Sequence, residues 1–331
     1  MTEGSRLANA ESLAPVVRSV FGWDRFVVRV ERMAGGSKKG VYRVTLDDGG
    51  SAVVYVWDES EDYWHDVLSE GAEDPADPFS HASGLALFEA AARRLSAAGA
   101  RCPDVRLTDG SRTVFPADIA VVEDVPGGSL EALLERDAVA AERPLAMVGD
   151  WLRAMAAVRG PSFGKVAFVD AGGRAASPSC QRAVLDHALA QVSEIAAHDQ
   201  RMAAERSDLE DRLNRLAEPI EPRGDWALVH GELGADHVRL DAGGEPVLID
   251  LEGARYFDVE IEHVWTRMRF GDHYGSLGRF DLDEDRLRFY QVCMHLDLVA
   301  GPLRMAATDH PQRQWFADLA EHHLHHALGY R

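Results

Sequence analysis

Two acidic residues, Glu232 and Asp250, lie in the final third of the chain, and each follows a short run of apolar residues. The first follows Trp226–Val229 and the second follows Val247–Ile249. Each segment predicts a short strand that delivers a carboxylate into a site. Phosphoryl transfer from a nucleotide needs one carboxylate to orient the attacking hydroxyl and another, with a neighbouring ligand, to hold Mg²⁺. Glu232 fits the first role, and Asp250 with His237 fits the second.

The residues around these acids resemble the aminoglycoside phosphotransferase family of kinase-like small-molecule phosphotransferases. In that family the catalytic loop reads His-Gly-Asp-Leu-x-x-x-Asn and the metal strand reads Ile-Asp-Trp or Ile-Asp-Leu. His230, Gly231 and Leu233 match the loop as they stand, and Ile249–Leu251 matches the strand. The resemblance implies a phosphotransferase that uses Mg²⁺ and a nucleoside triphosphate.

Two positions depart from the family pattern. Glu232 stands where the family has the Asp base, and His237 replaces the Asn, as in the macrolide-phosphotransferase branch. The resemblance implies catalytic roles for Glu232 and His230, with Asp250 and His237 as metal ligands. Glu is one methylene longer than Asp, and His is an uncommon Mg²⁺ ligand because hard cations prefer oxygen. The alternative is that Glu232 and Asp250 have no catalytic role and are simply a loop acid and a strand acid of the kind found in any α/β protein.

A glycine-rich hairpin near the N-terminus offers a nucleotide-binding half. Val27–Met33, Val41–Leu46 and Ala52–Trp57 predict three strands, with a glycine loop between the first two. In a kinase-like lobe such a loop lies over the phosphates, because glycine lets backbone N–H groups come close. A plain turn is the alternative. The loop residues expected to contact the nucleotide are Gly35, Gly36, Ser37, Lys38 and Lys39.

The family's strand lysine, which pairs with the nucleotide phosphates, has no counterpart. The matching register places Tyr55 there, and tyrosine cannot supply a positive charge. Lys38 or Lys39 could reach the phosphates as a substitute point charge. Alternatively both are solvated loop lysines, and a nucleotide site that has been weakened or lost is then expected.

Ser83–Ala98 carries apolar residues at helical spacing and predicts an amphipathic helix. The resemblance makes this the helix whose Glu meets the strand lysine, so Glu89 is the candidate. Because the lysine is missing, a surface acid is an equally acceptable interpretation of Glu89.

A buried strand is predicted at Ile119–Val122, followed by a turn and a helix start at Ser129. The segment resembles the family's hinge between lobes. Backbone groups of Glu123, Asp124 and Val125 would there hydrogen-bond the purine edge.

The chain turns helical beyond this hinge. Asp258 and Glu262 occupy acid positions of a family segment and are expected to cap and anchor the helix that begins there.

The histidines at 322, 323, 325 and 326 put His322 and His326 on one helical face, a candidate metal pair, but solvated side chains are the favoured interpretation. The amphipathic patterns that predict helices are Leu145–Arg159, Gln181–Glu218 (one or two helices), Glu284–Ala300 and Gln312–Leu328.

The expected fold is α/β (α+β), a protein-kinase-like two-lobed fold with a small antiparallel-sheet lobe and a larger, mostly helical lobe. We place the nucleotide-binding lobe at 1–122, the hinge at 123–128 and the C-terminal lobe, with the acceptor pocket, at 129–331. A chain of 331 residues is long enough for two such lobes.

Charge and composition narrow the partners. A net charge of −20 argues against nucleic-acid binding, which needs a basic surface. It would attract a polycationic acceptor, and it would equally serve solubility alone. The sequence has no 18-residue apolar run and no N-terminal signal pattern, so no membrane partner and a cytoplasmic location are expected. Three widely spaced cysteines predict free, mostly buried thiols.

The function expected from these features is transfer of the γ-phosphoryl group of ATP or GTP to a hydroxyl of a small molecule. Antibiotics such as aminoglycosides and macrolides are the implied acceptors. The second hypothesis is a catalytically silent kinase-like binding protein that has lost the strand lysine.

Overall fold

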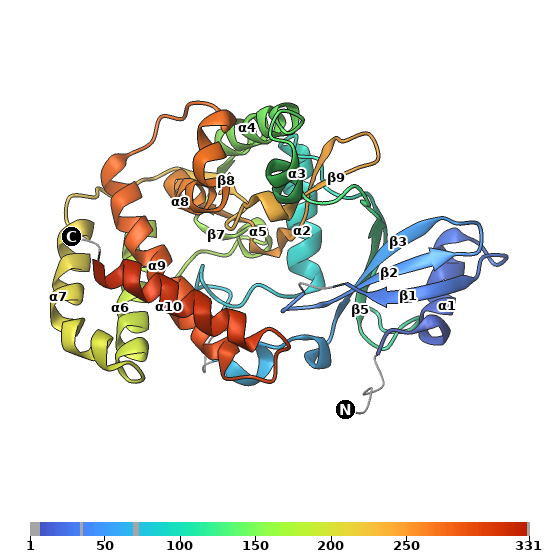
Figure 1. The fold of residues 1–331 in the computed structure, drawn as a ribbon, viewed down its shortest axis with the longest axis horizontal. Coiled ribbons are helices and arrows are strands. Elements are labelled where there is room, and N and C mark those ends of the chain that lie inside the picture. The colour runs from blue at the N-terminus through green and yellow to red at the C-terminus, as the bar shows by residue number, and fades with distance from the viewer. Residues whose placement is uncertain (1–6, 34–35, 69–72, 330–331) are drawn as a thin grey trace.

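This computed structural model describes residues 7–33, 36–68 and 73–329. Figure 1 shows a sheet-containing lobe on the right and a larger helical lobe on the left, which confirms the expected two-lobed fold. Gly35, one of the expected nucleotide contacts, lies outside the described residues. Within the described ranges, no helix is long and apolar enough to cross a bilayer.

The N-terminal sheet is antiparallel throughout, and its strand order is β1-β2-β3-β5-β4. The glycine loop joins β1 to β2 and a tight turn joins β2 to β3, as the hairpin pattern predicts. The edge strand β4 was not singled out by the sequence. The five strands are β1 (Val27–Arg32), β2 (Gly40–Leu46), β3 (Ser51–Trp57), β4 (Val105–Asp109) and β5 (Asp118–Glu123).

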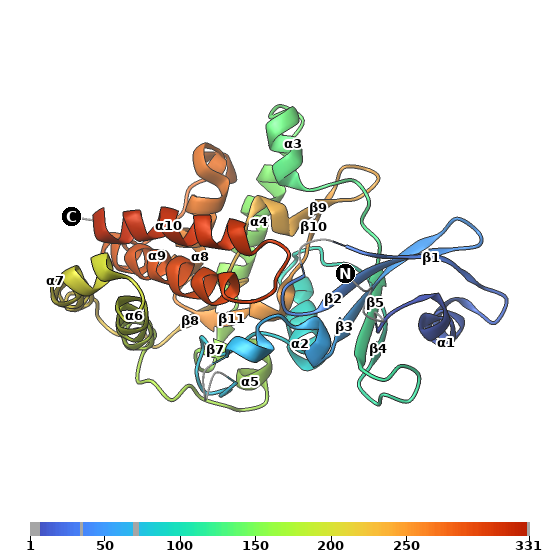
Figure 2. The same ribbon diagram turned by 60° about the horizontal axis from the view of Figure 1, so that its bottom comes forward.

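Strand β3 is buried on both faces because a helix covers each side of the sheet. Ala52, Val54 and Val56 pack into the cluster under α1 (Ala10–Phe21), a helix that the sequence patterns did not single out. The alternate residues of β3 pack into the cluster that contains α2 (Leu85–Ala97). Figure 2 shows the two helices on opposite faces. Side chains of a strand alternate between faces, so a nearly continuous apolar run fits this position.

The C-terminal lobe is mostly helical, with short strand pairs at its centre that carry the polar clusters. Its helices are α3 (Leu130–Arg136), α4 (Glu142–Ala157), α5 (Val166–Asp170), α6 (Cys180–Ala196), α7 (Gln200–Ala217), α8 (Val259–Phe270), α9 (Glu284–Ala306) and α10 (Arg313–Gly329). Its strands are β6 (Arg159–Gly160), β7 (Gly164–Lys165), β8 (Trp226–Val229), β9 (Val238–Leu240), β10 (Pro246–Leu248) and β11 (Arg255–Phe257).

Two helix predictions gain detail. The 181–218 stretch is two helices, because Asp199 caps the second one by accepting from the N–H groups of Arg201 and Met202. Helix α9 continues six residues beyond the predicted end at Ala300, to Ala306, and contains Pro302.

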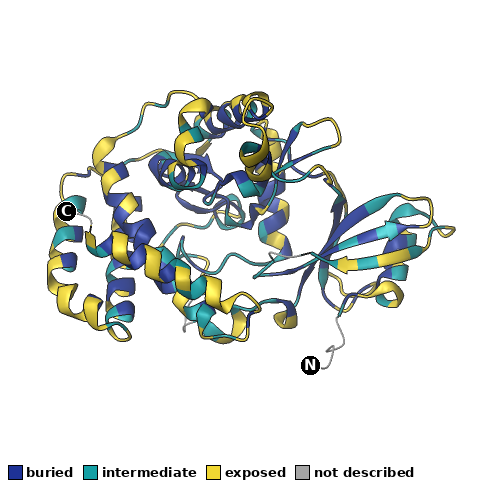
Figure 3. Cartoon of the chain, in the orientation of Figure 1, coloured by how far each residue is buried: buried dark blue, intermediate teal, exposed yellow. Residues whose placement is uncertain are grey.

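Figure 3 shows burial concentrated where the helices face the central strands. Cys102, Cys180 and Cys293 are free and buried, as expected. The histidine prediction was partly wrong. His323 is buried and lies 2.8 Å, Nδ1 to Nδ1, from the buried His295 of α9. The packing of α10 on α9 turns one face of the histidine run inward, and a sequence pattern does not contain that packing partner.

The segment between β3 and α2 contacts both lobes. Its Glu61 is buried, pairs with Arg32 at 2.9 Å and accepts a hydrogen bond from Tyr42. Tyr63 stacks edge-on against His310, in the turn before α10, with ring centroids 4.5 Å apart. The glycine loop is therefore tied to the C-terminal helices through this segment, since the Tyr63 N–H donates to Ser37 O at 3.0 Å.

Candidate active site

The catalytic loop leaves the end of β8 and is fixed by a buried carboxylate. Glu262, on α8, accepts hydrogen bonds from the N–H groups of Gly231 at 2.9 Å and Leu233 at 3.2 Å. Gly231 has φ +100°, and a Cβ there would lie 2.9 Å from Gly253 O. Glycine is needed here for both reasons. Glu262 was expected to anchor its own helix; it holds the catalytic loop instead.

His230 lies behind the loop. Its side chain is buried, with the residue 1% exposed, and Nε2–H donates to Ile249 O at 3.0 Å. Burial lowers its pKa, so the ring is neutral near pH 7. This bond ties the catalytic loop to the segment that carries Asp250. The geometry suits a positioning residue better than the catalytic role expected from the sequence.

Glu232 is the unengaged acid of the loop. Its carboxylate is partly exposed and forms no hydrogen bond or ion pair with another described residue. Asp236, the other carboxylate in this loop, is ion-paired with Arg269 of α8. A carboxylate without a protein partner can accept a proton from an incoming hydroxyl, whereas one held by arginine is a poor base.

His237 and Asp250 face each other across the expected metal position. Nδ1–H of His237 donates to Glu232 O at 2.9 Å, which leaves the Nε2 lone pair free. That nitrogen is 3.8 Å from Asp250 Oδ2. Asp250 has φ 62° and ψ 57°, a left-handed conformation that non-glycine residues seldom adopt. Such backbone outliers recur at functional sites, where surrounding structure holds them.

Lys39 occupies the centre of the cleft and is not a solvated lysine. It is 6% exposed, and Nζ donates to Asp250 Oδ1 at 3.0 Å and to the buried Glu252. Burial alone would lower its pKa, but the charges of Glu252 and Asp250 raise it, so the ammonium persists. The Lys39 charge in turn lowers the pKa of Asp250.

Tyr55 stands at the strand-lysine position and contributes packing. Its ring meets Phe88 of α2 edge-on at 5.5 Å and Trp57 at 6.0 Å. Burial raises its pKa to about 12. Glu89 is exposed and has no partner among the described residues, so it is a surface acid. Aromatic packing replaces the strand-to-helix ion pair of the family pattern. The Lys39 ammonium lies 5.1 Å from the Tyr55 ring centroid.

The side chains of Glu123 and Asp124 form ion pairs with arginines of the N-terminal lobe. Asp124 receives two hydrogen bonds from Arg43, at 2.9 and 3.0 Å. Glu123 pairs with Arg101 at 2.8 Å. The Val125 N–H has no hydrogen-bond partner among the described residues. A backbone donor is thus available at the hinge.

One cavity of about 280 Å³ joins these parts. The predicted residues that line it are Gly36, Lys39, Glu123, Asp124, Val125, His237 and Asp250. Ser37 and Lys38 follow the lining glycine but are held by the β3–α2 segment. Trp64 Nε1 donates to Ser37 Oγ at 3.2 Å, and Ser83 Oγ donates to Lys38 O at 2.7 Å.

Two residues with direct roles, Glu252 and Arg239, escaped the sequence analysis, and Glu262 has a role other than the expected one. Glu252 fixes Lys39, and only its place two residues after Asp250 could have drawn attention to it. Glu262 holds the catalytic loop. Arg239 lines the cavity and donates to Val125 O at 3.4 Å. Each acts through a residue distant in sequence, so no local spacing marks it.

The family model described as the phosphotransferase enzyme family matches residues 29–297. The fold is similar to that of aminoglycoside phosphotransferase APH(4)-Ia, with a TM-score of 0.62 and 18% identity over 97% of this chain and 99% of that one. A thermostable mutant of that protein, in a ternary complex with ADP and hygromycin B, gives a TM-score of 0.58 over 96% of each chain at 18% identity. Macrolide 2'-phosphotransferase type I gives 0.57 at 14% identity, covering 97% and 98%. No curated protein sequence matches the chain.

Proposed function

This chain belongs to the phosphotransferase enzyme family, and from that premise we propose that it moves the γ-phosphoryl group of ATP or GTP to a hydroxyl of a small molecule. One observation carries the proposal. A single cavity gathers a buried lysine, a hinge with a free N–H, a histidine with a free Nε2 and an acid in a left-handed turn. Together these groups provide the positioning and charge that phosphoryl transfer needs.

The nucleotide would lie with its purine against the hinge and its phosphates toward Lys39. The Val125 N–H supplies a donor for the purine edge, and Met33, Val41 and Val53 line the same cavity with apolar surface. Lys39 supplies the charge that the strand position lacks. Its ammonium group, held by Asp250 and Glu252 at the cavity, supports a working site over the silent binding protein.

Asp250 and His237 fit a Mg²⁺ ion bound together with the nucleotide. Among the described residues, no group of three or more His, Cys, Asp or Glu is arranged to hold a metal. Phosphate oxygens and water would therefore complete the coordination, which is usual for Mg²⁺. The ion, when bound, neutralises phosphate charge that develops during transfer. The hydrogen bond from His237 Nδ1 to Glu232 O orients Nε2 for such a role.

Glu232 would orient the acceptor hydroxyl and accept its proton. The hydroxyl oxygen forms a bond to the γ-phosphorus, the bond from that phosphorus to the bridging oxygen breaks, and the nucleoside diphosphate leaves. Glu262 and His230 keep the loop in place during this step through hydrogen bonds to or from backbone groups.

The acceptor is proposed to be a hydroxylated natural product of the antibiotic type. One structurally similar protein binds hygromycin B together with ADP. The net charge of −20 favours a cationic acceptor. Its contribution would appear as weaker acceptor binding at higher ionic strength.

The test is phosphate transfer from labelled ATP and GTP across aminoglycosides, macrolides, peptide and nucleoside antibiotics, repeated with Glu232→Gln. The variant should bind Mg²⁺-nucleotide as the parent does and lose roughly 10²–10⁴-fold in turnover, the usual contribution of a general base. Glu232→Asp is the matched comparison, because it keeps the charge and shortens the reach. Full turnover by Glu232→Gln on an identified acceptor would refute the assignment.

A further inference from the structure

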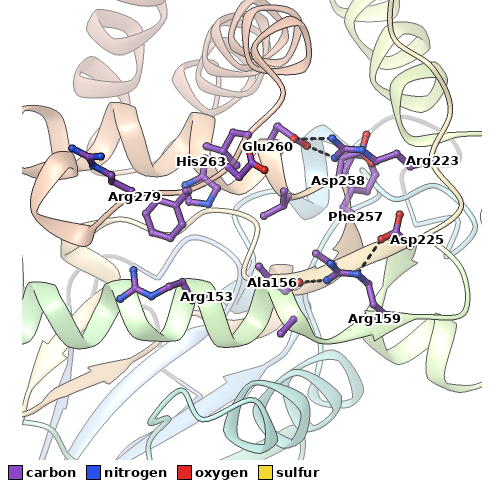
Figure 4. Close-up of a pocket in the computed structure, with 16 residues that line it drawn as sticks. Arg153, Ala156, Arg159, Arg223, Asp225, Phe257, Asp258, Glu260, His263 and Arg279 are labelled. Carbon is purple, nitrogen blue, oxygen red and sulfur yellow. Dashed lines mark hydrogen bonds and ion pairs between the residues drawn. The ribbon is translucent and has the colours of Figure 1, made fainter.

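A second cavity, of about 490 Å³, lies at the end of β8 that is remote from the catalytic loop. It is bounded by the end of α4, the start of β8, the first turns of α8 and the loop at 279–282 (Figure 4). Its lining residues differ from those of the nucleotide cavity. Asp225 and Ala227 line it, whereas the catalytic loop begins only after Val229.

Four arginines from four separate segments line this cavity. Two of them are neutralised within it: Arg159 pairs with Asp225 at 3.1 Å, and Arg223 pairs with Glu260 at 2.6 Å. Arg279, in contrast, is exposed and has no hydrogen bond or ion pair with another described residue. The Arg279 end of the cavity is therefore positively charged and can bind an anionic group.

Arg153 adds a second charge at the cavity. It donates to Leu277 O at 3.2 Å and pairs with Asp150 at 2.7 Å, but Asp150 is 74% exposed, so this surface pair is weak and leaves most of the charge unneutralised. Figure 4 shows Arg153 on α4 facing His263 on α8 across the cavity. The Arg153 guanidinium also lies 5.7 Å from the ring centroid of Phe280.

His263 offers a ring nitrogen without a protein partner at the cavity wall. The residue is 1% exposed, and its Nδ1 lies 2.8 Å from the hydroxyl of Tyr274. With the Tyr274 hydroxyl donating to Nδ1, the ring hydrogen sits on Nε2. Burial, followed by the charge of Arg267, lowers the His263 pKa to about 4 and keeps the ring neutral. Nε2–H has no acceptor among the described residues.

Apolar surface lies beside these polar groups. The Phe280 ring is 4.3 Å from the His263 ring, centroid to centroid, and Phe257 forms part of the floor. A ring N–H without a protein acceptor can donate to a ligand, and an apolar wall left to water costs free energy. A ligand that carries an acceptor group on an apolar body would satisfy both.

We propose that this pocket binds a small organic anion, with one carboxylate or phosphate group held by Arg153, Arg279 and His263 and an apolar body against Phe280. Two guanidinium groups and a neutral N–H donor are the partners that such anions prefer. The pocket adjoins Glu262, the residue before His263, which holds the catalytic loop.

Negative charge on the protein weakens the binding of an anion to this pocket but does not prevent it. Asp281 lies two residues from Arg279, lines the same cavity and is exposed. The protein's net charge of −20 also repels anions, but salt screens charges beyond about 8 Å at physiological ionic strength. Contacts inside the pocket then decide the binding.

The experiment is calorimetric titration of the full chain with benzoate and phenyl phosphate, and with benzyl alcohol as the uncharged probe. The anions should bind and benzyl alcohol should bind at least about tenfold more weakly, since it lacks a charged hydrogen bond. Arg279→Ala should weaken anion binding by a similar factor, and Asp281→Asn should tighten it. Arg288→Ala removes an exposed arginine outside the pocket and should leave binding unchanged.

Three results would overturn the proposal. One is equal affinity for benzyl alcohol and benzoate, or no binding of either anion at about 10 mM, the limit of weak millimolar affinity. Another is anion binding that Arg279→Ala leaves intact. The last is competition with nucleotide, because the probe would then occupy the Lys39 cavity. None of these readouts depends on phosphoryl transfer, so they are separate from the test of the proposed function.

Discussion

The N-terminal and C-terminal halves of the candidate cleft obtain their charged groups in different ways. In the C-terminal half, Glu232 and Asp250 follow short strands at the positions that the sequence pattern predicts. In the N-terminal half, the strand position holds Tyr55, and the cation comes from the glycine loop as Lys39. The C-terminal half keeps the family's sequence pattern. The N-terminal half lacks the lysine at its usual sequence position but has a positive charge in the same cleft.

The difference shows what an electrostatic site requires. Phosphates respond to an ammonium at a point, whichever backbone segment supplies it. With the ammonium on the loop, the strand position holds a packing residue. Tyr55, Trp57 and Phe88 form aromatic contacts there, worth about 0.5–1.5 kcal/mol for each well-oriented pair.

The largest expected effect tests the conventional half. Asp250→Asn should reduce Mg²⁺-dependent turnover by at least about 10³-fold, since metal-assisted charge stabilisation is worth several kcal/mol. Lys39 should stay ordered through Glu252. Nucleotide titrations with and without Mg²⁺, beside turnover assays, give the measurement. A variant that binds and turns over Mg²⁺-nucleotide like the parent would show that this half does not hold the metal.

A second prediction is that the stability of the C-terminal lobe is more sensitive to low pH than that of the N-terminal lobe. Burial lowers the pKa of His263, His295 and His323 to about 4, and all three lie in the C-terminal lobe. The unfolded chain, with pKa values near about 6.5, binds more protons below that pH. Stability is therefore complete above pH 6.5 and is lost as pH falls toward 4, by roughly 2 kcal/mol per independent histidine between pH 7 and 5.

Chemical unfolding at a series of pH values measures this loss, and hydrogen exchange locates it. His323→Gln should flatten the pH dependence, whereas His325→Gln, at an exposed position on the same helix, should not. Acid unfolding that begins in the N-terminal sheet would contradict the comparison.

The smallest effect tests the relocated charge. Lys39→Met should weaken nucleotide binding by about 10- to 100-fold, corresponding to roughly 1–3 kcal/mol for a charged hydrogen bond. Adding Tyr55→Lys should recover part of the affinity, because it returns an ammonium to the strand position. Titration with a nucleotide triphosphate analogue gives both values.

Matched controls sharpen this test. Lys38→Ala removes the neighbouring loop charge, and Glu89→Ala removes the exposed helix acid; neither should change nucleotide affinity appreciably. If Lys38→Ala and Lys39→Met cause equal, negligible losses, Lys39 is not the substitute for the strand lysine.

Much of the fold followed from local patterns. The first three strands, the Ser129 cap and the helix at 85–97 were predictable because periodicity, turn residues and caps act within a few positions. The helix at 10–21 and the edge strand β4 were not singled out. The burial of Glu61 and His323 was missed because their partners lie on other elements.

The sequence by itself determined the order of the lobes, the two acid clusters and the absence of a lysine at the strand position. Only the tertiary structure decided which loop lysine enters the cavity, because Lys39 meets Glu252 across 213 residues of chain. It also decided that Glu232 stays free while Asp236 is held by Arg269. Periodicity records which way a side chain points within its own element, whereas the charge that faces it is set by packing between elements.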